Sequence, residues 1–136
     1  MRRPVFFFDV LNVELEVSRP AAAGANGARV RFRLVVTNTG HHAIDLYLRG
    51  REPTLEVVVA RESGEIVWSS LQGVVIPASL QLVTLAARES LDVSAGWDQQ
   101  VDGMPIAAGT YLVRASLLAE DARIEAREQT LTMQRD

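Results

Sequence analysis

The stretch GWDQQVDGMPIAAGTYLV, residues Gly96 to Val113, places a Trp-Asp pair, a polar turn, a glycine and a tyrosine close together. Two interpretations fit this spacing. Asp98 and Asp102 could be ligands for calcium, or the stretch could be a corner at which a β-sandwich changes direction. The alternating oxygen donors and distal glutamate of an EF-hand loop are missing, so the corner is the favoured interpretation.

A corner gives each distinctive residue of this stretch a structural role. Trp97 closes one strand on its inward face, Asp98 accepts hydrogen bonds from turn amides, and Asp102-Gly103 forms a tight turn. Gly109 permits a close backbone approach just before the next strand. Tyr111 is predicted to bury its ring while its hydroxyl group hydrogen-bonds to a backbone group.

Apolar and polar residues alternate along most of the chain, as they do in antiparallel sheets with one buried face. Turn signals separate the alternating segments, and no helical segment stands between them. The sequence therefore predicts an all-β protein, an immunoglobulin-like antiparallel β-sandwich of about seven to nine strands, in a single domain over residues 1–136. The predicted strands are Val13–Val17, Val30–Val36, Ala43–Leu48, Leu55–Ala60, Glu65–Ser70, Leu80–Leu85, Leu91–Trp97, Tyr111–Leu117 and Ile124–Met133.

Three further structural predictions follow from the same pattern. Trp68 and Trp97 both point into the core, with Trp68 on the same face as Ile66. The small residues Ala21–Gly27 form a mobile loop. The first two strands pair so that Glu14 and Glu16 lie beside a row of arginines, Arg29, Arg31 and Arg33. This structural role of the arginines is favoured over phosphate binding.

Composition limits the possible functions. Of the 136 residues, 48% are apolar and 23% are charged, which is typical of a globular chain without a membrane span. The formal net charge of −3 argues against a nucleic-acid partner, which would require basic surface. The absence of cysteine excludes disulfides and zinc–cysteine sites. The apolar run near the N-terminus is interrupted at Asp9 without a cleavage site, so a β-strand and a cytoplasmic location are predicted.

No catalytic or cofactor-binding motif is recognisable. The only histidines, His41 and His42, are adjacent in a turn, and adjacent residues on a strand point to opposite faces. A solvated turn is therefore favoured over a metal site. There is no nucleophile elbow, phosphate loop or dinucleotide fingerprint. The sequence predicts a protein that is not an enzyme and needs no metal or cofactor.

Four segments occur in a moderately specific order: LVVTNTGHHAIDLYL (Leu34–Leu48), a hairpin ending in EIVWSS (Glu65–Ser70), VTLAARESLDVSAGWD (Val83–Asp98) and DGMPIAAGTYLV (Asp102–Val113). With this order the chain resembles the BsuPI type of intracellular proteinase inhibitor, a family of immunoglobulin-like β-sandwiches. The resemblance implies a non-enzymatic inhibitor or regulator of an intracellular subtilisin-like serine protease. The matching residues are framework residues, so no inhibitory residue can be carried over.

The alternative is a generic protein-interaction or accessory module whose partner is not a protease. In either case the candidate partner-binding loop is LQGVVIPAS, Leu71 to Ser79, which is unusually apolar for a connection. Pro77 removes a backbone donor, so this segment cannot be an ordinary central strand. A bulged edge strand with its apolar side chains tucked under the sandwich is the favoured interpretation. The other is an exposed extended segment that pairs with a protease cleft or a sheet edge through Leu71, Val74, Val75, Ile76 and Pro77.

Overall fold

Strands account for all the regular secondary structure of the computed structural model, which describes residues 10–18, 29–120 and 123–133. The predicted all-β class is confirmed. Twelve strands are present within these residues, more than the seven to nine predicted. They are β1 (Leu11–Ser18), β2 (Val30–Asn38), β3 (Ile44–Arg49), β4 (Leu55–Arg61), β5 (Ile66–Ser69), β6 (Leu80–Leu85), β7 (Ser90–Trp97), β8 (Gln100–Val101), β9 (Met104–Pro105), β10 (Gly109–Leu118), β11 (Arg123–Glu125) and β12 (Gln129–Met133).

The additional strands have two origins. β8 and β9 have two residues each, too few to give an alternating pattern. The predicted segment Ile124–Met133 is divided into β11 and β12 because its register against β10 changes: Leu117 pairs with Ile124, whereas Tyr111 pairs with Leu131. The segment between β11 and β12 therefore contains one residue more than the part of β10 that it faces, and this extra residue interrupts the strand. The residues before Val10 and the predicted loop Ala21–Gly27 lie outside the described residues.

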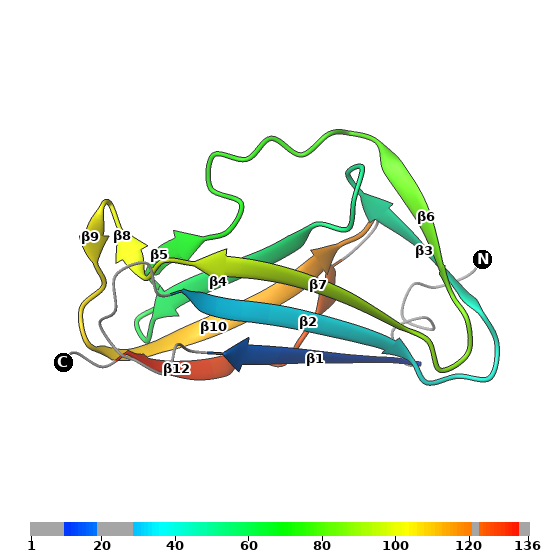
Figure 1. Cartoon of the computed structure of the whole chain (residues 1–136), viewed down its shortest axis with the longest axis horizontal. Helices are drawn as coiled ribbons and strands as arrows, with labels where there is room; N and C mark the ends of the chain where they lie inside the picture. Colours follow the sequence, from blue (N-terminus) through cyan, green and yellow to red (C-terminus); the bar gives the residue numbers. More distant parts are fainter. Residues whose placement is uncertain (1–9, 19–28, 121–122, 134–136) are drawn as a thin grey trace.

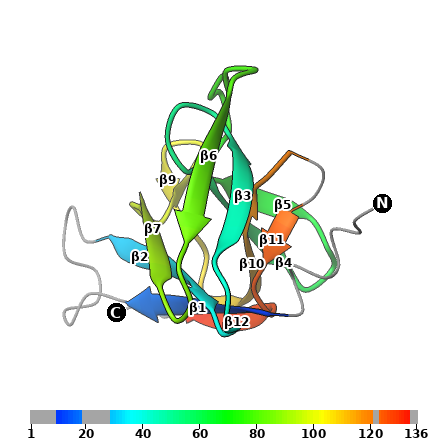
Figure 2. The ribbon, with the colours of Figure 1, turned by 90° about the vertical axis from the view of Figure 1, so that its right-hand side faces the viewer.

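Two antiparallel sheets enclose the core (Figure 1). One contains β1, β2 and β7 in that order. The other contains β11, β10, β4 and β5, with β12 also paired to β10. Seen end-on, β2 and β7 lie on one side, with β4, β10 and β11 on the other, while β3 and β6 stand together at the near end (Figure 2). The β3–β6 pair is a separate two-stranded sheet.

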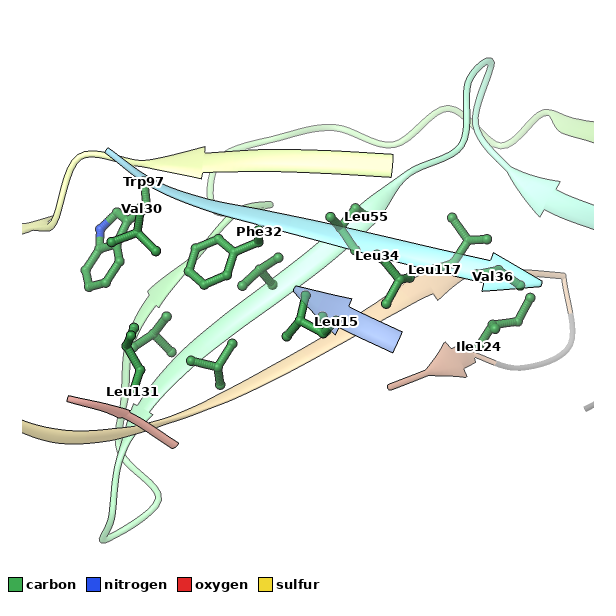
Figure 3. Close-up of a cluster of buried hydrophobic side chains, with 14 of the residues drawn as sticks. Leu15, Val30, Phe32, Leu34, Val36, Leu55, Trp97, Leu117, Ile124 and Leu131 are labelled. Carbon is green, nitrogen blue, oxygen red and sulfur yellow. The ribbon is translucent and has the colours of Figure 1, made fainter. Parts of the chain in front are cut away.

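Side chains from both sheets meet in the core drawn in Figure 3. Val30, Phe32, Leu34 and Val36 alternate along β2 and are completely buried, as the sequence pattern predicts. Burying an apolar side chain of this size contributes roughly 1.5–3 kcal/mol, so these alternating rows hold the two sheets together. The facing sheet contributes the buried residues Leu55, Val57, Val59, Val113, Ala115 and Leu117.

The two tryptophans stack at one end of the core. Their ring centroids are 5.2 Å apart, and Trp68 also stacks on Phe32 at 6.0 Å. Trp97 is 1% exposed and Trp68 is partly buried, so both point inward as predicted. The prediction that Ile66 shares the Trp68 face is wrong, because Ile66 is 56% exposed. The β4–β5 register shifts by one residue, and such a bulge puts the alternation out of phase.

The predicted corner is confirmed by its hydrogen bonds. Tyr111 is 2% exposed, and its hydroxyl group donates a 2.7 Å hydrogen bond to the carbonyl oxygen of Ala107. The indole Nε1 of Trp97 donates to the carbonyl oxygen of Gln100 at 3.1 Å. The polar atom of each buried ring is therefore satisfied by the turn beside it.

The turn within this corner has a structural explanation as well. Asp102 and Gly103 have φ angles of 52° and 79°, the combination that a two-residue hairpin turn requires between β8 and β9. The carboxylate of Asp98 accepts a 3.1 Å hydrogen bond from the backbone N–H of Gln100. These contacts give the two aspartates turn-forming roles, as the corner interpretation predicts.

The predicted pairing of acidic and basic rows holds at one position. Glu16 lies opposite Arg33 and contacts it at 2.8 Å, and Arg33 also contacts Asp92 of β7 at 2.5 Å. Hydrogen bonds to Asp92 and then Glu16, together with their charges, raise the pKa of Arg33 above its ordinary value. Glu14 lies opposite Val35 and not opposite an arginine. In place of the predicted row of ion pairs, Arg33 of β2 links Glu16 of β1 to Asp92 of β7.

Asn38, at the end of β2, joins the two turns that carry β3 and β6. Its side chain is completely buried, and its Oδ1 accepts a 2.9 Å hydrogen bond from the N–H of Gly40. Its Nδ2 donates to the carbonyl oxygens of His42, Leu85 and Ala86 at 2.8, 3.0 and 3.2 Å. Since His42 precedes β3, Leu85 ends β6 and Ala86 follows it, this amide fixes the β3–β6 pair relative to the sandwich.

Candidate functional site

The predicted partner-binding residues lie on the connection from β5 to β6, which runs along the top edge of the molecule in Figure 1. Ser70 anchors its beginning to β4. The Ser70 hydroxyl accepts a 2.8 Å hydrogen bond from the N–H of Val57 and donates one of 3.1 Å to the carbonyl oxygen of Leu55. A turn follows, in which the N–H of Val74 donates to the carbonyl oxygen of Leu71 at 3.0 Å.

The far end of the connection is anchored to the turn after β3. The carbonyl oxygen of Ser79 accepts a 2.9 Å hydrogen bond from the N–H of Gly50. Gly50 has a φ of +92°, and a Cβ atom there would lie 3.9 Å from the Cγ2 atom of Ile76. Ile76, which is partly buried, therefore lies close to this glycine.

Between these anchors the predicted site residues divide into two groups. Val75 is 89% exposed and Val74 is 51% exposed, and Pro77 is also exposed. Leu71 and Ile76 are partly buried. Residues 71–79 form no strand, so the favoured interpretation of this segment as a bulged edge strand is wrong. The connection thus exposes two adjacent valines to solvent, while hydrogen bonds of Ser70 and Ser79 hold its two ends to the rest of the protein.

The neighbouring β3–β6 pair exposes further apolar side chains that the sequence analysis did not identify. Tyr47 lies opposite Leu82, and their exposures are 50% and 55%. Leu80, beside them on the same face, is 44% exposed. Leu85, also on β6, is buried. Large apolar side chains that are exposed together commonly mark interaction surfaces.

A sequence signal for this surface does exist. No charged residue occurs between Glu65 and Arg88, a run that includes β5, the connection and the whole of β6. Solvent-facing strands normally carry charges among their apolar residues. An uncharged run of this length is therefore compatible with a surface that is covered by another chain.

Titratable groups of the described residues do not match the ligand sets that metal ions require. No group of three histidine, aspartate or glutamate side chains there could hold a metal ion. His41 and His42 are exposed in the turn before β3. The described residues also contain no helix of the length and apolar character required to span a membrane.

Two open pockets lie on the outer faces of the sheets. A pocket of about 460 Å³ is lined by five charged side chains, four of which form ion pairs: Arg114 lies 3.8 Å from Glu128, and Arg123 contacts Glu56. Another, of about 360 Å³, lies on the opposite sheet between the exposed Arg29 and Arg31. Neither of these two pockets includes a residue of the connection or of β6.

Comparison with protein families gives one assignment. A family model described as BsuPI, intracellular proteinase inhibitor, matches residues 12–122. This range includes the corner, the connection and the strands from β2 to β10. No curated protein matches the chain by sequence.

Solved structures share the fold at low sequence identity. The putative ApaA protein from Bordetella pertussis is 16% identical with a TM-score of 0.51, over 93% of this chain and 95% of that one. A structural-genomics target protein is 12% identical with a TM-score of 0.50, over 92% and 88%. A putative β-galactosidase from Bacteroides fragilis is 13% identical with a TM-score of 0.50, over 86% of this chain but 15% of that one. These similarities concern the sandwich fold alone.

Proposed function

The chain belongs to the BsuPI family of intracellular proteinase inhibitors, and on that basis we propose that it is a non-enzymatic inhibitor of a subtilisin-like serine protease. The proposed contact is the exposed part of the connection, Val74 to Pro77. We further propose that it acts in the cytoplasm, as a single domain and without a cofactor.

The observation that carries this proposal is that the exposed valines lie between fixed points. An inhibitory segment binds tightly when little conformational entropy is lost on docking, and many small inhibitors achieve this with disulfides. This chain has no cysteine. Here the hydrogen bonds of Ser70 and Ser79 hold the two ends of the connection, and Ile76 rests close to Gly50 between them. Pro77 adds a fixed φ angle at the end of the exposed part.

The chemistry of the exposed residues suits a protease cleft that accepts extended apolar chain. An extended segment can offer backbone groups to a cleft while alternate side chains enter pockets. Val75 is the most exposed of the large apolar residues in the described part of the chain, at 89%. We therefore propose that Val75 provides the main side-chain contact with the protease.

The test is the substitution Val75→Asp, assayed as the inhibition constant against a purified intracellular subtilisin-type protease with a peptide substrate. A charge in an apolar pocket should remove a binding hot spot. We expect inhibition to weaken at least thirtyfold, equivalent to about 2 kcal/mol. Because Val75 is 89% exposed, the melting temperature should not change.

Met104→Asp is the matched control. Met104 is 70% exposed on the β8–β9 hairpin, away from the connection, so its substitution should leave inhibition within twofold of the parent. A folded Val75→Asp protein that inhibits as well as the parent would rule out this segment as the contact. If the parent itself inhibits no subtilisin-type protease, the alternative of an interaction module with a non-protease partner is favoured.

A further inference from the structure

The outer edge of β6 has unpaired backbone groups within the described part of the chain. β6 pairs with β3 alone there, and the bond from Gly50 N–H to the Ser79 carbonyl identifies one hydrogen-bonded pair of that ladder. Antiparallel ladders alternate between hydrogen-bonded and non-hydrogen-bonded pairs. The N–H and C=O groups of Leu80, Leu82 and Thr84 therefore point away from β3.

The other edge of the pair is closed, which supports this assignment. The carbonyl oxygen of Tyr47 on β3 accepts a 2.9 Å hydrogen bond from the N–H of Glu120, beyond the end of β10. Tyr47 lies opposite Leu82. Since the backbone carbonyl of Tyr47 points outward from the pair, the backbone of Leu82 must point outward on the opposite side.

Unlike β6, three other edge strands of the described residues carry features that discourage pairing with another chain. β1 presents Glu14 and Glu16, β7 presents Asp92, and β5 is short and bulged. Charges and bulges are the usual protection of sheet edges. β6 has no charge, no proline and no register shift against β3. This edge is chemically suited to a partner strand.

We propose that the partner is a second copy of this chain, paired antiparallel through β6 about a twofold axis at Leu82. In this register Leu82 faces its own copy and Leu80 faces Thr84, and each of these pairs exchanges two backbone hydrogen bonds. A symmetric pairing brings each residue near its own copy, so a charged edge would repel itself. An edge without charge can pair with itself even though the chain carries a net charge of −3.

Side chains on the outer face favour the same register. Leu80, Leu82 and Thr84 are all exposed on one face of β6, and Tyr47 stands beside Leu82 on β3. The twofold axis would join the two copies into a four-stranded sheet, β3–β6–β6–β3, with both tyrosines and both Leu82 side chains in one apolar cluster. An interface of one strand per copy is smaller than a standard interface, so we expect a dissociation constant on the order of 10–100 µM.

The first experiment uses the absence of native cysteine. Opposed Cα atoms in such a pair lie about 5.5 Å apart, within the range of a disulfide. We expect Leu82→Cys to form a covalent dimer on mild oxidation, and Ile66→Cys, at a position of equal exposure on β5, not to do so. Leu80→Cys alone should not cross-link, because the two copies of residue 80 would lie roughly 13 Å apart. A mixture of Leu80→Cys and Thr84→Cys should cross-link.

The second experiment measures the dimer without cross-linking, by sedimentation velocity of the full chain over a concentration series. Leu82→Lys should raise the dissociation constant at least tenfold, because two ammonium groups would meet at the axis, while Ile66→Lys should not. A chain that is monomeric at every concentration would overturn the proposal, as would a dimer unaffected by Leu82→Lys. If the monomeric chain instead lost protease inhibition on Leu82→Lys, the edge would receive the protease and not a second copy.

Discussion

Replacing Asn38 with alanine tests whether one buried amide holds the β3–β6 pair in place. The side chain makes four hydrogen bonds, to Gly40, His42, Leu85 and Ala86. Each is worth roughly 0.5–1.5 kcal/mol net, so their joint loss should cost about 4 kcal/mol of unfolding free energy. For a chain of this size that corresponds to a fall in melting temperature of roughly 15 °C.

The assay is urea unfolding followed by tryptophan fluorescence, with hydrogen exchange as a local measurement. In Asn38→Ala the Gly40 amide loses its acceptor, so its exchange should accelerate more than global stability alone explains. Asn12→Ala is the matched control, because Asn12 is exposed and its amide donates a 3.0 Å hydrogen bond to the exposed Glu14, and it should cost less than about 0.5 kcal/mol. A cost below about 1 kcal/mol for Asn38→Ala would refute the role assigned to this network.

Two further predictions concern the aromatic residues of the corner. Trp97→Ala should cost roughly 3–5 kcal/mol by urea unfolding, since the side chain is 1% exposed, while Trp68→Ala should cost less because Trp68 is only partly buried; the reverse order would contradict the packing described. Tyr111→Phe removes the 2.7 Å bond to Ala107 and should cost about 1 kcal/mol in the same assay; an unchanged stability would show that the hydroxyl contributes nothing to the corner.

Much of the fold follows from residues that are close together in the sequence. The period-two alternation predicts the strands and the inward face of β2, because successive side chains on a strand point to opposite faces. The Asp102-Gly103 turn and the Tyr111 corner are predictable for the same reason: each depends on a few neighbouring residues and on backbone geometry that only some residue types adopt.

Long-range contacts limit what the pattern can predict. The bulge that turns Ile66 outward arises where β5 pairs with β4. The alternation of residues within β5 alone does not predict it. The partners of Asn38 at Leu85 and Ala86 lie far along the chain, so the sequence predicts a turn there but not a buried junction.

The candidate site shows the same division. Sequence alone identified the apolar connection Leu71–Ser79 and excluded an ordinary central strand, because Pro77 lacks a backbone donor. It left open whether Val74 and Val75 are buried or exposed. Tertiary structure decided this, since exposure depends on where Ser70 and Ser79 attach to β4 and to Gly50. The free edge of β6 was likewise decided by which strands pair, and pairing depends on contacts between residues distant in the chain.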